Sequence, residues 1–155
     1  MNVAQQIAQT HLDVLNGGNW TDVSLLDTLN DVTVAEAVLQ TKASPNTIAS
    51  LVHHLAYWNG IMAKRVQGKL IPIPEENGFD VPPLNSENDW KNLIEDCKHS
   101  FAEVVEVING VDEVRIWETI VPGKGSVYQN IQGSVEHIHY HLGQIVIIKK
   151  LIRSS

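Results

Sequence analysis

Two histidines four residues apart, His137 and His141, give the clearest indication of chemistry in this sequence. On an α-helix, residues at this spacing lie one turn apart on the same face, so their imidazoles could hold one metal ion from a rigid element. The spacing fits equally well a pair of histidines hydrogen-bonded at the edge of a core. His139 lies about 200° around the same helix and is expected to face solvent or a neighbouring subunit.

A second pair, His53 and His54, lies in an earlier helical pattern. His54 shares an apolar stripe with Leu51 and Trp58, whereas His53 lies among smaller and more polar residues, so His54 is expected to point inward. Alone, an inward histidine is best interpreted as a hydrogen-bonded core residue. Three inward histidines on two helices instead favour a His₃ metal site, which leaves coordination positions open as catalytic zinc sites do. Imidazole also suits Ni²⁺, Fe²⁺ and Cu²⁺, so the metal is left open.

Four stretches with the apolar periodicity of amphipathic helices must position these histidines. They cover approximately residues 3–15, 45–67, 87–109 and 129–152. In the second stretch, Ser44 is the expected N-cap and Pro45 the expected first helical residue.

Longer connections separate these helices. Residues 19–42 could contain short helices near Leu25 and over 34–39, and residues 114–127 could form a short hairpin or an ordered loop. The segment 70–84 contains four prolines, which preclude a regular helix and indicate an extended crossover. We therefore predict an all-α fold, a four-helix bundle with long crossover connections, as a single domain over residues 1–155.

Composition excludes several classes of function. The net charge is −7 and Lys and Arg form no cluster, which argues against binding to nucleic acid or to an anionic membrane surface. No apolar run approaches the roughly 18 residues of a membrane-spanning helix. A single cysteine, Cys97, permits no intrachain disulfide, and the first residues lack the features of a secretory signal, so a cytoplasmic location is expected.

Other residues are weaker candidates. Gln144, one turn beyond His141, could orient a ligand or a bound water, or could be an ordinary helix-packing residue. Trp58, one turn beyond His54, is a further candidate to line a cleft beside the ligands, although it is more typical of the core than of a substrate platform. Cys97 lies on an apolar stripe and is expected to be a buried, inert thiol. We expect ordinary packing roles for Tyr57 and Tyr140, and positions on the solvated surface for Glu118 and Glu136.

Two motifs resemble those of the DinB/YfiT-like family. The first is SPNTIASLVHHLAYW, residues 44–58, which resembles that family's second helix with its inward histidine. The second is HIHYHLGQI, residues 137–145, which resembles its last long helix, where HxxxH is often followed by Gly-Gln. The motifs are short, but their combination and separation are more specific, and the order and lengths of the helices also agree over most of the chain.

The resemblance implies a four-helix bundle, usually dimeric, with a His₃ metal site. Carried onto this sequence, it implies His54, His137 and His141 as ligands. Characterised relatives include thiol-dependent S-transferases and an isomerase that uses low-molecular-weight thiols.

Two functions are compatible with these features. The first is a metal-dependent enzyme of the thiol S-transferase or hydrolase type, acting on a small molecule. Its cofactor would be one divalent ion, most simply zinc or nickel, with a low-molecular-weight thiol as a further candidate. The second is a non-catalytic, metal-binding, dimeric interaction module. A deep cleft beside the metal would favour the enzyme, and a closed site would favour the module.

Overall fold

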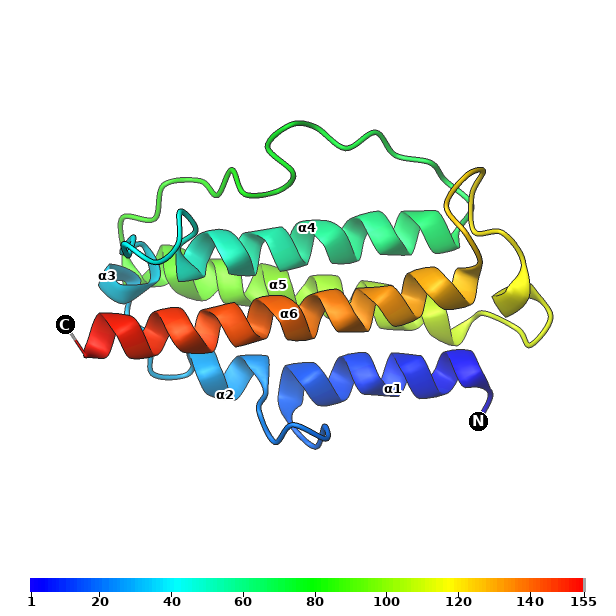
Figure 1. Ribbon diagram of the computed structural model, residues 1–155, viewed down its shortest axis with the longest axis horizontal. Helices are drawn as coiled ribbons and strands as arrows, with labels where there is room; N and C mark the ends of the chain where they lie inside the picture. Colours follow the sequence, from blue (N-terminus) through cyan, green and yellow to red (C-terminus); the bar gives the residue numbers. More distant parts are fainter. Residues whose placement is uncertain (155) are drawn as a thin grey trace.

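A computed structural model describes residues 1–154, and this part of the chain contains helices and no β-strand (Figure 1). The predicted all-α class is confirmed. Six α-helices and one short 3-10 helix follow in order: α1 (Val3–Asn16), α2 (Leu25–Leu29), α3 (Val34–Ala37), α4 (Ile48–Val66), α5 (Glu87–Asn109), η1 (Arg115–Trp117) and α6 (Val127–Arg153).

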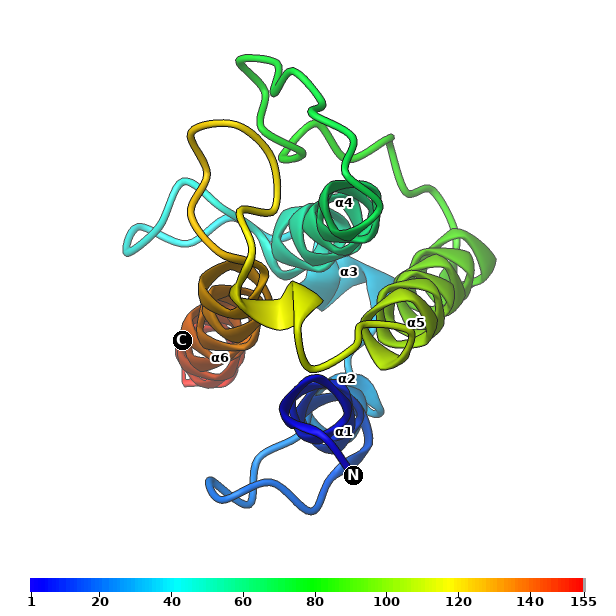
Figure 2. The ribbon, with the colours of Figure 1, turned by 90° about the vertical axis from the view of Figure 1, so that its right-hand side faces the viewer.

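The four long helices lie side by side around one apolar core (Figure 2). Both α4 and α1 pack against α5 and α6, so that α4 and α1 occupy opposite corners of the arrangement. The core between them includes the fully buried side chains of Leu51, Leu55, Phe101, Ile131 and Ile138. The predicted apolar stripes therefore meet as expected for an α-helical bundle.

The start of α4 differs from the expectation. Thr47, not Ser44, is the N-cap, and Ile48, not Pro45, is the first helical residue. The Thr47 hydroxyl accepts a hydrogen bond from the Ser50 amide at 3.1 Å, and the Ser50 hydroxyl accepts one from the Thr47 amide at 3.0 Å. This reciprocal capping box satisfies two backbone donors. Ser44 instead pairs with Thr41 in an isolated antiparallel bridge.

The proline-containing segment between α4 and α5 is an extended crossover, as predicted, and it follows the outer side of α4 (Figure 1). At Asn77 and Gly78 the backbone adopts left-handed conformations, with φ of 52° and 77°. This local turn is closed by hydrogen bonds from the Asn77 amide to the Pro74 carbonyl and from the Phe79 amide to the Glu76 carbonyl. It directs the carbonyl groups of Asn77 and Gly78 toward α4.

The remaining connections are short helices and ordered loops. The expected short helices in the first link are α2 and α3, and ion pairs hold this link to the end of α6. Lys149 and Arg153 both pair with Asp31, and Arg153 also pairs with Glu36. The segment before α6 contains η1 and one isolated bridge, Thr119 with Ser126, so it is an ordered loop. Among the described helices, none is long and apolar enough to cross a membrane.

Candidate metal centre

Three imidazoles from two helices converge at one point between α4 and α6. His54 comes from the middle of α4, and His137 and His141 come from the middle of α6. The Nε2 atom of His137 lies 3.1 Å from that of His54 and 3.0 Å from that of His141. His54 and His141 are buried and His137 is half-buried. The structure thus brings together the three residues that the sequence analysis selected.

Hydrogen bonds on the far side of two of these rings fix their protonation. The Nδ1 atom of His54 lies 2.7 Å from the carbonyl oxygen of Asn77, which can only accept, so Nδ1 carries the proton. Likewise, His141 Nδ1 donates to the Gln144 side-chain oxygen at 2.7 Å. In a neutral imidazole the other nitrogen then carries a lone pair. The Nε2 lone pairs of His54 and His141 therefore both face the centre of the triad.

The three converging Nε2 atoms fit a bound cation better than they fit a hydrogen-bond network. A proton on His137 Nε2 could serve His54 or His141, but not both. A divalent ion would accept all three lone pairs at ligand distances of ~2.0–2.1 Å, which place neighbouring nitrogens a little over 3 Å apart in tetrahedral geometry. The outer hydrogen bonds resemble those that fix ligand orientation in protein metal sites.

Aromatic side chains enclose the triad. Phe79, from the crossover, stacks on His54 with ring centroids 3.9 Å apart and an interplanar angle of 13°. Trp58 presents an edge contact to His54 and to His137, with centroid distances of 6.3 and 5.8 Å. Such a wall limits water around the imidazoles and strengthens charge interactions inside the site.

Burial favours the neutral form of all three imidazoles. Desolvation, followed by repulsion from neighbouring imidazolium groups, lowers the pKa of His137 to about 4. Desolvation also lowers the pKa of His54 to about 4, although the hydrogen bond to Asn77 opposes the shift. The pKa of His141 is lowered for the same principal reason. Neutral imidazole is the form that binds metals, so burial keeps all three side chains in the ligand form below the usual histidine pKa.

The other two candidate histidines lie outside the triad. His53 donates from Nδ1 to the Gly78 carbonyl at 2.8 Å, and so it anchors the crossover. His139 donates from Nδ1 to the Val135 carbonyl of its own helix at 3.0 Å and is half-buried rather than fully solvent-facing. It lies close enough to the buried His11 to affect its pKa. Neither ring points to the point shared by the three Nε2 atoms.

A cleft of about 260 Å³ opens beside the triad between α4 and α6. His137 and Trp58 both line it, and Trp58 is half-buried: one edge of its indole meets the imidazoles and another part faces the cleft. The indole nitrogen donates to the Asn77 side chain at 3.2 Å. The side chain of Arg65 also lines this cleft.

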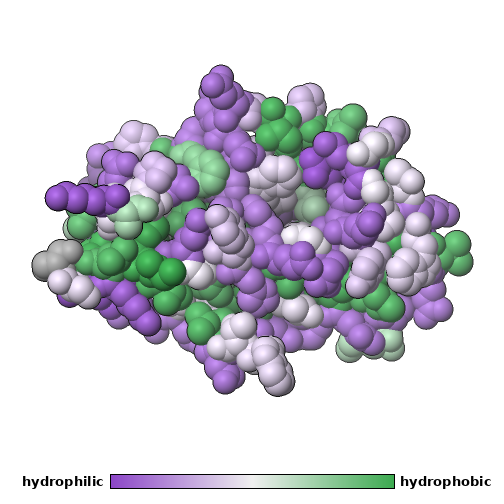
Figure 3. Space-filling view, in the orientation of Figure 1, coloured by the Kyte–Doolittle hydropathy of each residue, from purple (hydrophilic) through white to green (hydrophobic). Residues whose placement is uncertain are grey.

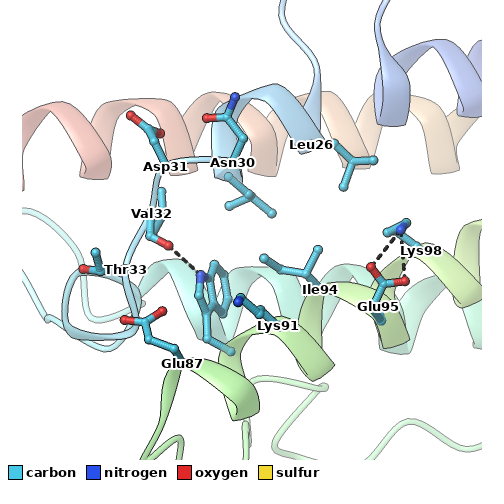
Figure 4. A pocket seen from close by; sticks show the side chains of 12 residues that line it. Leu26, Asn30, Asp31, Val32, Thr33, Glu87, Lys91, Ile94, Glu95 and Lys98 are labelled. Atoms are coloured by element: carbon cyan, nitrogen blue, oxygen red, sulfur yellow. Dashed lines mark hydrogen bonds and ion pairs between the residues drawn. The ribbon is translucent and has the colours of Figure 1, made fainter.

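A second cavity, of about 410 Å³, lies between α5 and the α2–α3 link, and no histidine lines it (Figure 4). Lys98 pairs with Glu95 and Glu87 accepts from the Val34 amide, whereas Lys91 has no ion pair or side-chain hydrogen bond among the described residues. The indole nitrogen of Trp90 donates to the Val32 carbonyl within it. Lys91 is exposed, so the cavity offers one solvated lysine and no cluster of converging side chains comparable to the triad.

The weaker candidates have structural roles. Gln144 orients His141, as described above, and its amide nitrogen donates to the exposed Tyr140 hydroxyl at 3.2 Å. Tyr57 packs beneath Gly78. Cys97 is buried, and burial raises its pKa to about 12, so its thiol is inert as expected.

Sequence reasoning missed the contribution of the crossover. Asn77 and Gly78 hold the two α4 histidines through backbone carbonyls, and Phe79 covers His54. The Asn-Gly pair predicts a turn, but no local pattern indicates which helix a turn contacts. Also missed was buried His11, whose ring nitrogen lies 3.3 Å from the hydroxyl of Ser134, a residue that lines the cleft.

Comparisons with known proteins give one match. The family model for the DinB superfamily matches residues 19–145, a range that contains all three histidines of the triad. No curated protein and no solved structure matches the chain.

Proposed function

Because the chain belongs to the DinB superfamily, we propose that it binds one divalent metal ion through His54, His137 and His141 and is a metal-dependent enzyme of the thiol S-transferase or hydrolase type. Zinc or nickel suits the three-imidazole set. The observation that carries the proposal is the convergence of the Nε2 atoms, with two lone pairs fixed inward, beside an open cleft.

The side chains around the triad have definable tasks in such an enzyme. The ion would supply positive charge that favours the deprotonated form of a thiol or of water. The Asn77 carbonyl and the Gln144 amide hold two imidazoles in their ligand orientation. Phe79 and Trp58 exclude water from the inner side, while three protein ligands leave room for a small molecule on the cleft side.

The cleft favours an enzyme over a non-catalytic module. In a purely structural site four protein ligands surround the ion, whereas here three nitrogens converge and one of the three residues, His137, also lines a cavity. This contact would allow a substrate to approach the ion. A metal-binding interaction module would have no need of the opening.

Thiol binding tests the proposed chemistry. Cobalt-substituted protein, prepared without a His tag, should change its visible absorption when small thiols are added, because thiolate is a softer ligand than water. Metal-loaded protein should then transfer the thiol to electrophiles and lose this activity in His137→Ala. Ester or amide hydrolysis without thiol binding would favour the hydrolase. If no thiol binds and no hydrolysis occurs, the protein is a module and the enzymatic proposal is wrong.

We also propose that the protein is a homodimer that associates through the exposed face of α6. Tyr140 and Ile147, two turns apart, are 64% and 60% exposed, and apolar side chains gather over the C-terminal half of α6 (Figure 3). Such a face is typical of subunit contacts. Ile147→Glu should shift the mass measured by light scattering from dimer to monomer, whereas Val114→Glu, at another exposed apolar residue, should not. A monomeric wild-type protein at micromolar concentration would contradict this.

A further inference from the structure

Arg65 is a buried cation without a protein counter-ion. Its side chain belongs to α4, three turns beyond His54, and the residue is only 8% exposed. Among the residues that the structure describes, no carboxylate forms an ion pair with its guanidinium, and its buried Nε atom has no hydrogen-bond partner. Burying a charge without a partner is costly, so this arrangement requires an explanation.

The guanidinium lies over an aromatic ring. Its central carbon lies 5.3 Å from the ring centroid of Trp58, a cation–π distance. The same indole contacts His137 at a centroid distance of 5.8 Å. Trp58 therefore separates the unpaired cation from the histidine triad, and both lie along the same cleft.

The rest of the cleft matches a small ligand with one negative charge. Arg65 is the only Lys or Arg among the residues that line it, so one anionic charge would neutralise it. Trp58 and Met62 provide an apolar surface, and Gln129, Asn130 and Ser134 provide polar groups from α6. The volume, about 260 Å³, lies below the range of ~300–1,000 Å³ common for drug-sized ligands.

We propose that the cleft binds a small monocarboxylate, whose carboxylate pairs with Arg65 and whose other end reaches the three-histidine centre. A carboxylate is favoured because a planar guanidinium can bind it through two parallel hydrogen bonds, and because a phosphate would bring a second charge for which no second Lys or Arg lines the cleft. This inference rests on the proposed metal-dependent function, since it places the reacting end of the ligand at the metal.

Two ligands with the same thiol and carbon chain test the subsite: 3-mercaptopropanoate, which carries a carboxylate, and its uncharged amide, 3-mercaptopropanamide. Binding to metal-loaded protein is measured by calorimetry after metal content has been determined for each sample. Wild-type protein should bind the carboxylate at least about tenfold more tightly, as expected for a charge-assisted pair. Arg65→Met should remove this preference while the affinity for the amide and the metal content stay unchanged. Arg65→Lys should retain part of the preference.

Lys64→Met is the matched control, because Lys64 is an exposed neighbour that does not line the cleft. It should behave as the wild type. Equal affinity of the wild-type protein for the two ligands would overturn the subsite without any variant, and so would a preference that survives in Arg65→Met. If the protein still holds its full metal content, neither of these results contradicts the metal centre. Protein that binds no metal would instead contradict the proposed function itself.

Discussion

Replacement of His54 by alanine is expected to lower the affinity for a divalent metal by more than about 100-fold, which exceeds the usual cost of losing an outer hydrogen-bond partner of a metal ligand. The reason is geometric: its Nε2 atom faces that of His137, while the Asn77 carbonyl fixes the proton on the opposite nitrogen. Of the three converging nitrogens, α4 contributes only the one on His54, and alanine removes it. Competitive titration of zinc against a chromophoric chelator measures the change.

Two neighbouring histidines supply the controls for this experiment. His53 donates to the Gly78 carbonyl and so helps to hold the crossover in place. His53→Ala should therefore lower the affinity for the metal by no more than about tenfold. His139 donates to the Val135 carbonyl of its own helix, and His139→Ala should leave the metal affinity unchanged. A larger loss in His53→Ala than in His54→Ala would contradict the assignment of the ligand on α4.

Gly78→Ala is expected to destabilise the protein and to weaken metal binding at the same time. Gly78 has a φ of 77°, and a Cβ atom built there would lie 2.6 Å from two ring carbons of Tyr57. The left-handed conformation costs roughly 1–2 kcal/mol for an L-residue, and relief of the clash must move either the crossover or Tyr57. We expect a total cost of about 2–4 kcal/mol. Displacement of the crossover should also lower metal affinity by about tenfold, because Asn77 orients His54.

Gly123→Ala isolates the conformational cost. Gly123 has a φ of 76°, but nothing lies within 4 Å of the Cβ position. This variant should lose only about 1–2 kcal/mol and keep its metal affinity. Thermal unfolding measures the difference, since 1 kcal/mol corresponds to about 2–4 °C for a chain of this size. Equal effects of the two substitutions on both properties would show that the crossover does not hold the site.

Local sequence signals were sufficient for most of the helices. The third long helix begins and ends as predicted, at Glu87 and Asn109, because Ser86 caps it and Gly110 follows it. The phase of the apolar stripe also distinguished His54 from its neighbour. The start of α4 was misplaced by three residues because two cap signals compete there. Ser44 with Pro45 resembles a helix start, but the reciprocal bonds of Thr47 and Ser50 fix the first turn.

The parts of the site that could not be predicted depend on contacts between distant segments. Nothing in the sequence near Asn77 indicates that its carbonyl accepts a hydrogen bond from His54, since the side-chain pattern carries no information about the contacts of backbone groups. Arg65 was not singled out by the sequence, since a basic residue near a helix end is common. Its burial is a feature of the folded chain, in which Arg65 faces residues of α6 across the cleft.

The most direct test of the metal centre is anomalous diffraction from crystals of untagged protein soaked with saturating zinc. We predict one strong anomalous peak per chain, bound by the Nε2 atoms of His54, His137 and His141 at ~2.0–2.1 Å, with Nδ1 of His54 still donating to the Asn77 carbonyl. No peak at the triad under these conditions, or three imidazoles that point to different regions, would contradict the central claim.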